Sequence, residues 1–460
     1  MFAKIKARWP EEAGYRQLLK VAFPLILSSG STSILLFVDR MLLSWYSNEA
    51  IAAALPTGIL NWTFICVFFG MAMYTSTFVA QYTGANRPER VGASIWQGLY
   101  ISLIGSILIP LIAPFSEEIF AVIGHAPRIQ EMEAEYLKIL NCCTFFFLAN
   151  AILSCFYSGR GKAWTIVWIN VLLTILNTIF DWILIFGNWG FPEMGIKGAG
   201  YATFASSGIV VAIYFILFLS PKNERIYSTR SAWHLDKDLC RRMLKFGFPA
   251  GMHFFLDVIG FTIFTMLVGR LGVVDAAANN ITQQIHLLGL LPLVGLGIAN
   301  TIMVGQYQGA GKSDLAERAS YSSMQMAFLY NALVSITYLL VPYLFIAPFF
   351  AAREVPPSQE LIDLITNLLK LVALFSLFEG VVIISSGTLK GAGDTAFVMR
   401  TLAITSVLLV IVPTVVVIEI LQLPLLWAWG VLTINLLALS TIFFLRVRSG
   451  KWKQNKVIEE

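Results

Sequence analysis

Charged residues are scarce in this chain of 460 residues. Asp, Glu, Lys and Arg together make up 13% of the sequence, about half of the roughly 25% that is usual in soluble domains. Hydrophobic residues make up 57%, and the mean hydropathy is +0.74. A soluble protein of this length could not cover its surface with so little charge, so most of the surface must face lipid. The composition therefore predicts an integral membrane protein.

Cysteine is also rare, and its placement excludes several kinds of site. The five cysteines show no metal-ligand spacing and mostly lie in apolar runs, as small buried hydrophobic residues do. The short Gly-rich joints lack the eight-residue P-loop pattern. The N-terminus lacks the features of a cleavable signal. We therefore expect no cofactor and no structural metal, and the absence of a nucleophile constellation argues against an enzyme.

Long apolar runs dominate the sequence. A helix needs about 20 apolar residues to cross a bilayer, and these runs are too long and too continuous for barrel strands, which alternate. The sequence thus predicts an all-α membrane protein with twelve transmembrane helices. Their approximate cores are 21–44, 55–79, 93–115, 137–157, 164–187, 198–220, 246–269, 280–304, 320–342, 364–388, 397–420 and 424–445.

Basic residues predict how the chain is oriented. The net charge is +5, and Lys and Arg gather in the loops of one side, in the stretch 222–245 and in the tail 446–456. The opposite loops are poor in basic residues and contain Glu117, Glu193 and Glu419. Cytoplasmic loops carry such an excess, so we expect both termini in the cytoplasm of a multi-pass protein of the plasma membrane, the bacterial inner membrane. The positive charge gives no reason to expect nucleic-acid binding.

Two short segments recur at one constant spacing. Leu19–Pro24 (LKVAFP) matches Leu244–Pro249 (LKFGFP), and Val79–Ala85 (VAQYTGA) matches Val304–Ala310 (VGQYQGA), both with an offset of 225. The chain is thus a duplicated unit with six spans per copy, which gives both copies the same orientation. Parallel repeats of this kind are related by a pseudo-two-fold axis along the membrane normal, with the substrate path at their interface.

The repeat predicts the domain organisation. We expect an N-lobe over 1–220, a cytoplasmic linker over 221–242, and a C-lobe over 243–460 that ends in a basic cytoplasmic tail. Pro24 and Pro249 occupy equivalent positions in the first helix of each lobe. Proline removes a backbone hydrogen bond and can kink a helix, so these residues are either hinges or prolines tolerated near a helix start.

Four acidic residues lie well inside apolar runs, namely Asp39, Asp181, Asp257 and Glu379. An acid at the centre of a membrane helix costs about 2.5–3.5 kcal/mol, and such residues usually line a water-filled path. Asn177 precedes Asp181 by four residues and shares its helix face, and Asp39 falls at a similar depth. Oxygen ligands of this kind suit a hard cation such as Na⁺, and paired carboxylates suit a proton.

Two basic side chains accompany these acids. His253 lies one turn before Asp257 on the same face. It is either a structural hydrogen-bonding residue or a partner that tunes or shares a proton. Arg40 follows Asp39 and points to a different face, from which we expect it to extend toward the interface.

Several motifs resemble those of the multidrug and toxic compound extrusion (MATE) family. They are Phe37–Asp39 (FVD), Asn177–Gly187 (NTIFDWILIFG) followed by Gly198–Thr203 (GAGYAT), and Leu389–Thr395 (LKGAGDT), together with the duplicated segments. The similarity extends over all twelve helices. It implies an antiporter that expels organic cations against an inward flow of Na⁺ or H⁺, with alternating access of the two lobes.

The pattern is most similar to the NorM branch of that family. The resemblance implies coupling roles for Asp257 and Glu379, where that branch carries a Glu and an Asp respectively, so the two carboxylate lengths are exchanged. It implies cation or proton binding in the N-lobe by Asp39, Asn177, Asp181 and Thr203. Arg40 departs from the pattern, which has a small polar residue there.

The resulting hypothesis is a secondary active multidrug efflux antiporter. Its partners would be small amphipathic cations and the lipid bilayer, and we expect a monomer. The sequence leaves H⁺ and Na⁺ open as coupling ions. An alternative is a lipid-linked oligosaccharide or pyrophosphate flippase of the same broader superfamily, which would need several basic residues in its cavity, where Arg40 is the one candidate.

Overall fold

The computed structural model of the chain describes residues 9–350 and 357–459. The first eight residues of the expected N-lobe and the last residue of the expected tail lie outside them. In the described part, twelve helical segments are long and apolar enough to cross a membrane. The all-α class and the twelve predicted spans are therefore confirmed.

The described residues form two compact units. The N-unit contains residues 27–251 and 457–459, and the C-unit contains 9–26 and 252–456 with the gap noted above. The chain passes between the units inside two helices, α2 (Tyr15–Tyr46) after Ile26 and α10 (Lys237–Val268) after Gly251. These crossings are 225 positions apart, like the sequence repeat, and each follows a repeated proline by two residues. The boundaries between the two units therefore lie after Ile26 and Gly251. The lobe limits expected from chain order are residues 220 and 243.

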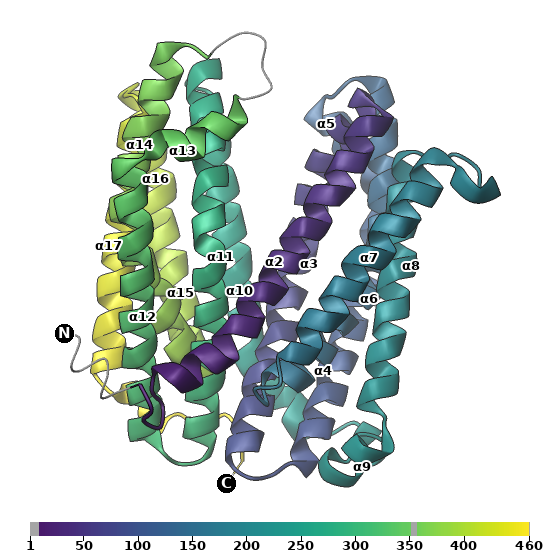
Figure 1. The fold of residues 1–460 in the computed structure, drawn as a ribbon, viewed down its shortest axis with the longest axis vertical. Coiled ribbons are helices and arrows are strands. Elements are labelled where there is room, and N and C mark those ends of the chain that lie inside the picture. Colours follow the sequence, from purple (N-terminus) through teal and green to yellow (C-terminus); the bar gives the residue numbers. More distant parts are fainter. Residues whose placement is uncertain (1–8, 351–356, 460) are drawn as a thin grey trace. The chain divides into compact units, whose positions relative to one another are not determined.

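The N-unit is built around one central helix. Helix α6 packs against α3, α4 and α8, and α8 packs in turn against α7 (Figure 1). The elements of this unit are α3 (Asn48–Gly84), α4 (Glu89–Leu108), η1 (Ile109–Phe115), α5 (Ser116–Ile123), α6 (Pro127–Ser158), α7 (Trp164–Phe186), η2 (Asn188–Gly190), α8 (Ile196–Phe218), α9 (Pro221–Tyr227) and η3 (Ser231–Trp233).

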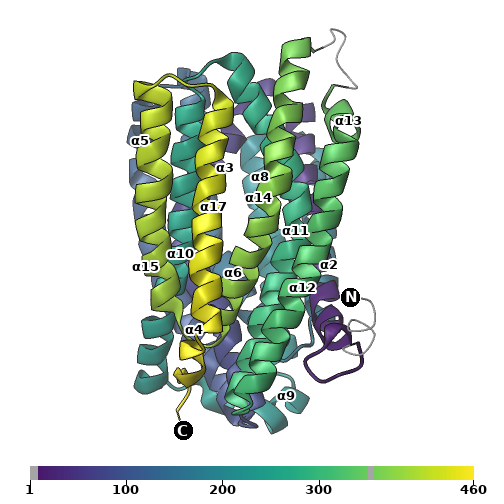
Figure 2. The same cartoon turned by 90° about the vertical axis from the view of Figure 1, so that its left-hand side faces the viewer.

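The C-unit has a similar plan around α14. This helix packs against α11, α12 and α17, and α17 lies between α14 and α15 in Figure 2. The elements of this unit are α11 (Val273–Gly309), α12 (Ser313–Leu340), α13 (Pro342–Ile346), η4 (Ala347–Phe349), α14 (Gln359–Gly391), α15 (Thr395–Thr405), η5 (Ser406–Ile411), α16 (Val412–Val415), η6 (Val416–Ile420), α17 (Leu425–Arg448) and η7 (Lys451–Gln454).

The repeat extends to helix length. Helices α3 and α11 both have 37 residues, and both their first and their last residues are 225 positions apart. The eleventh span differs because two π-helical segments, η5 and η6, flank the short α16. Pro413 lies in α16 and has no N–H to donate, and local π-helical turns can re-satisfy the backbone groups that a proline frees in a membrane helix.

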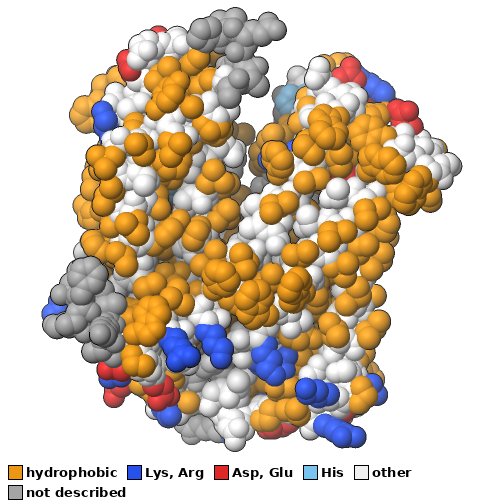
Figure 3. Space-filling model, viewed as in Figure 1, with side chains coloured by type: hydrophobic (Ala, Val, Ile, Leu, Met, Phe, Trp, Pro, Cys, Tyr) orange, Lys and Arg blue, Asp and Glu red, His pale blue; other side chains and the backbone are white. Residues whose placement is uncertain are grey.

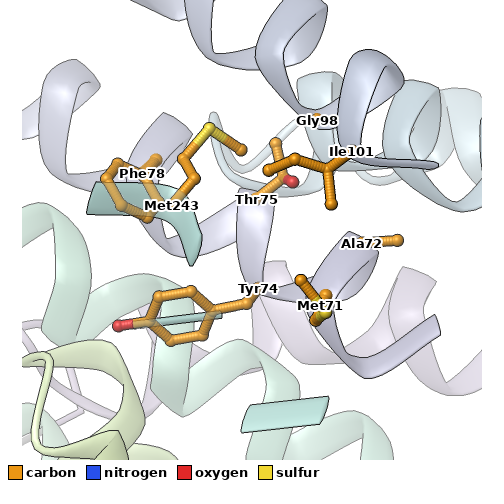
Figure 4. Close-up of a pocket in the computed structure, with 8 residues that line it drawn as sticks. All are labelled: Met71, Ala72, Tyr74, Thr75, Phe78, Gly98, Ile101 and Met243. Carbon is orange, nitrogen blue, oxygen red and sulfur yellow. The ribbon is translucent and has the colours of Figure 1, made fainter. Parts of the chain in front are cut away.

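Small residues let the helices of the N-unit approach closely. In Figure 4 side chains of α3 and α4, together with Met243 of α10, line one small pocket. A Cβ on Gly98 would lie 2.9 Å from the Thr75 hydroxyl oxygen. Close approach through small residues is how membrane helices associate, because lipid provides no hydrophobic force between them. The first turns of α10 are thus an integral part of the N-unit.

The segment expected to be a linker is folded onto α4. Trp96 Nε1 donates a hydrogen bond to the Thr229 carbonyl oxygen at 2.7 Å, and Gln97 Nε2 donates one to the His234 carbonyl oxygen at 3.0 Å. Both donors come from α4 and both acceptors from the stretch around η3. Most Lys and Arg side chains on the face drawn in Figure 3 lie toward the lower end of each unit, as the basic loops in the sequence predict.

Candidate functional site

Two carboxylates are buried in the N-unit. Asp181 on α7 is fully buried, and neither of its carboxylate oxygens has a hydrogen-bond partner among the described residues. Asp39 on α2 is half-buried, and its Oδ1 is likewise buried and unpartnered there. A buried polar atom without a partner costs free energy, and a carboxylate costs most when it is charged. These oxygens are therefore available to a proton or a cation.

The structure brings the N-unit residues together as predicted from helix spacing. Asp39 and Asp181 lie close enough to interact electrostatically. Both carboxylates also interact electrostatically with the hydroxyl group of Tyr136. Asn177 is buried one turn before Asp181, with an unpartnered Nδ2. Tyr136 on α6 is a buried neighbour that the sequence analysis missed, because it lies in the polar stretch QEMEAEY just before the predicted span 137–157.

Thr203 and Arg40 take up different surroundings. Thr203 is half-buried on α8, where its carbonyl oxygen accepts a hydrogen bond from the Ser206 hydroxyl at 3.2 Å. Arg40 is exposed on α2, whereas Asp39 directs an oxygen into the protein. The prediction that Arg40 and Asp39 face different ways is confirmed.

In the C-unit, Asp257 on α10 faces His253 one turn earlier. His253 Nδ1 lies 3.4 Å from Asp257 Oδ2, and the side chains are 11% and 52% exposed respectively. The imidazole Nδ1 is nevertheless buried and makes no hydrogen bond with the described residues, so this is a close approach rather than a bond. Lys390 of α14 acts electrostatically on both side chains. Asp257 thus has two basic residues near it, His253 and Lys390.

Glu379 on α14 has a partner on the neighbouring α11. His286 Nε2 lies 3.3 Å from Glu379 Oε1, and both side chains are about 15% exposed. The imidazole ring also contacts Phe375 edge-on at 5.0 Å between centroids. His286 was missed by the sequence analysis. The sequence did contain a signal for His286. Histidine occurs four times in the chain, and His286 lies within an apolar run.

The acids occupy separate positions rather than one metal centre. Within the described residues, no three His, Cys, Asp or Glu side chains come together in a way that could hold a metal ion. What the arrangement offers is a pair of interacting carboxylates in the N-unit and two carboxylate–imidazole pairs in the C-unit. Groups of this kind, inside membrane-spanning helices, mark ion and proton paths.

Comparisons with known proteins agree with this picture. The MatE family profile matches residues 24–183 and 249–416, two segments that again start 225 positions apart. A "Probable multidrug resistance protein NorM" of Mesorhizobium japonicum is 27% identical over 391 residues, which cover 84% of this chain and 83% of the relative. A protein of the same name from Thermotoga maritima is 24% identical and covers 96% of this chain and 94% of the relative.

A solved structure supports the same fold. It is described as the outward-facing conformation of a multidrug resistance MATE family transporter of the MOP superfamily, and it matches with a TM-score of 0.84 at 20% identity, over 94% of this chain and 95% of that one. The profile covers well over half of the sequence in two segments that follow the internal repeat. This chain therefore belongs to the MatE family, whose members are membrane transporters and not enzymes.

Proposed function

We propose that this protein is a secondary active multidrug efflux antiporter that exports organic cations in exchange for H⁺ or Na⁺ by alternating access. The observation that carries the proposal is the burial of Asp181 with both carboxylate oxygens unpartnered by the described residues. Membrane helices do not retain such a group for packing, because it costs about 2.5–3.5 kcal/mol. A residue that alternately binds and releases a cation accounts for that cost.

Each unit supplies its own carboxylates to the proposed exchange. Asp39, Asn177 and Asp181, with Thr203 on the neighbouring α8, form the N-unit set. Asp257, Glu379 and His253 form the C-unit set. A bound ion shifts a conformational equilibrium only through its different affinity for the two states. The coupling ion and the drug must therefore either compete for these acids or act through them.

Pro24 and Pro249 are proposed as hinges of this motion. Each lies inside a continuous helix, and the chain passes from one compact unit to the other two residues later. A proline lacks one backbone hydrogen bond of the helix ladder, so bending there costs less than elsewhere in the helix. The equivalent positions in the two repeats would let both helices bend at the same depth.

The proposed setting is the bacterial inner membrane, with both termini cytoplasmic. The basic loops and tail support this orientation through the positive-inside rule. The relatives named as probable multidrug resistance proteins support drugs as substrates, and we propose that these are amphipathic cations. We propose a monomer as the transporting species, since each chain carries both sets of acids. The flippase alternative has less support. A pyrophosphate needs basic side chains in the cavity, whereas the candidate site consists mainly of acids, namely Asp39, Asp181, Asp257 and Glu379.

The test uses purified protein in liposomes loaded with an ethidium-like dye, under a pH gradient or a Na⁺ gradient, each alone. We expect dye efflux under one of them. Asp257→Asn, Glu379→Gln and Asp181→Asn should abolish efflux, because each change removes a carboxylate proposed to bind the coupling ion. The thermal midpoint should stay within a few degrees of the wild type. Asp363→Asn is the matched control, since Asp363 is exposed on α14 and accepts a hydrogen bond from Gln359. Full transport by the three variants would refute the proposed role of these acids.

A further inference from the structure

A cluster of three arginines at one end of the N-unit holds a carboxylate. Arg90 Nε donates a hydrogen bond to Glu459 Oε1 at 2.9 Å, and Arg242 Nη1 lies 2.5 Å from Glu459 Oε2. The Tyr82 hydroxyl donates to Oε2 at 2.7 Å, and Arg87 Nη1 donates to the Glu459 backbone carbonyl oxygen at 3.0 Å. We call Tyr82, Arg87, Arg90 and Arg242 the arginine cluster.

The cluster is organised for an oxyanion. Three guanidinium groups and one hydroxyl group converge on one side chain, and Asp236 fixes Arg90 through a contact of 2.9 Å to Nη1. Arginine is suited to this role because its planar fork matches the oxygens of carboxylates and phosphates. Three Arg face two acids, Glu459 and Asp236, so the site keeps a net positive charge even when Glu459 is bound.

The carboxylate held by the arginine cluster is half-buried. Glu459 is the last residue that the structure describes, and its side chain is 32% exposed. The three arginine side chains are exposed to a similar degree. Val457 is fully buried, whereas Ile458 and Glu459 are half-buried, so the Glu459 side chain can leave the arginines while Val457 stays in place. Burial would raise the pKa of Glu459, but the hydrogen bond from Tyr82 and the charges of Arg90 and Arg242 outweigh it and lower that pKa.

The cluster also lies at the ends of three candidate membrane spans, where lipid headgroups are expected. Tyr82 is in the last turn of α3, Arg90 is in the first turn of α4, and Arg242 is in the second turn of α10. All three helices are candidate membrane spans. Basic pockets between the ends of transmembrane helices bind the headgroups of anionic lipids. The phosphate of such a headgroup has the same oxygen chemistry as the carboxylate that occupies the cluster.

We propose that the arginine cluster is a binding site for the phosphate of an anionic phospholipid headgroup, and that Glu459 is a displaceable ligand from the chain itself that competes for it. When the Glu459 side chain leaves, Asp236 is the acid that remains beside the three arginines among the described residues, and the site gains one net positive charge. The lipid phosphate then takes the place of Glu459, and residues 458–459 are freed. This site is independent of the acids proposed for coupling.

The test compares the full-length protein in nanodiscs of phosphatidylcholine with and without phosphatidylglycerol. The readouts are the phosphatidylglycerol molecules retained in native mass spectra and the hydrogen exchange of residues 457–459. Phosphatidylglycerol should increase that exchange. Glu459→Gln should retain phosphatidylglycerol more tightly, and Arg90→Gln or Arg242→Gln should bind it about fivefold more weakly, the factor expected for one arginine at a headgroup. Arg241→Gln is the matched control, because Arg241 is exposed next to Arg242.

Inorganic phosphate in phosphatidylcholine nanodiscs distinguishes the two sources of the anion. If phosphate frees the tail and phosphatidylglycerol does not, the headgroup is not the ligand and the proposal is wrong. It is also wrong if neither changes the exchange of residues 457–459, or if Arg241→Gln weakens retention as much as Arg242→Gln. The wild-type comparison needs no variant, so a variant that fails to fold leaves the result decisive.

Discussion

His286 and Glu379 meet across two helices, with 3.3 Å between Nε2 and Oε1, although they are 93 positions apart in the sequence. The contact joins α11 to α14, which pack directly against each other. It gives Glu379 a basic partner inside the C-unit. Without this partner the carboxylate would be an unpaired charge in an apolar environment, which is costly. His286 thus belongs with the proposed coupling residues, although it was absent from the set expected from the sequence.

Replacement of His286 should affect both stability and transport. A hydrogen bond to a charged group contributes about 1.5–3 kcal/mol, so we expect His286→Ala to lower the thermal midpoint and to slow dye efflux by about tenfold. Thermal unfolding in detergent and efflux from liposomes measure the two effects. His234→Ala is the control, since His234 lies in the segment after η3 and stacks on Trp233. Equal effects of the two changes would contradict a specific role for His286.

The crossing of α3 and α10 should not tolerate a side chain at Gly251. A Cβ there would lie 2.2 Å from the Val67 carbonyl oxygen, closer than atoms can approach without a shift of the helix. Overpacking costs about 1–3 kcal/mol, so Gly251→Ala should lower the thermal midpoint measured in detergent. Gly247→Ala, one turn earlier, places its Cβ 3.8 Å from Met71 Cα and should be neutral or slightly stabilising. A comparable loss in both variants would disprove the proposed tight crossing.

The docking of the tail should weaken in acid. The pKa of Glu459 is lowered in the folded protein, below the value of about 4.3 for a free Glu. Docking therefore contributes its full stability above the unfolded pKa and loses it as the pH falls through the folded pKa. Hydrogen exchange of residues 457–459, corrected for the intrinsic rate, should rise in that range, by an amount that corresponds to about 1 kcal/mol for exposed ion pairs. Glu459→Gln should exchange fast at every pH, and a retained pH step in that variant would exclude Glu459 as the cause.

Local features of the sequence were sufficient for much of the fold. Lipid-length apolar runs predicted twelve spans, and the repeated segments predicted the 225-residue relationship that α3 and α11 follow residue by residue. The spacing of Asn177 and Asp181, and of His253 and Asp257, predicted shared helix faces because a helix returns to the same face every three to four residues. The roles of these residues in coupling stay predictions.

Contacts between distant helices could not be obtained in this way. Hydropathy and periodicity describe one helix at a time, whereas the His286–Glu379 pair and the proximity of Tyr136 to Asp39 and Asp181 depend on how helices pack. The same holds for the assignment of residues 9–26 to the C-unit and of residues 457–459 to the N-unit.

The sequence by itself thus determined the membrane class, the number of spans, the duplication and the presence of acids inside apolar helices. Each of these features depends only on local composition and spacing. The tertiary structure decided which partners those acids have and where the ends of the chain are held. The physical reason is that a buried charge in a membrane protein is stabilised by the few groups that reach it from other helices, and those groups can come from any part of the chain.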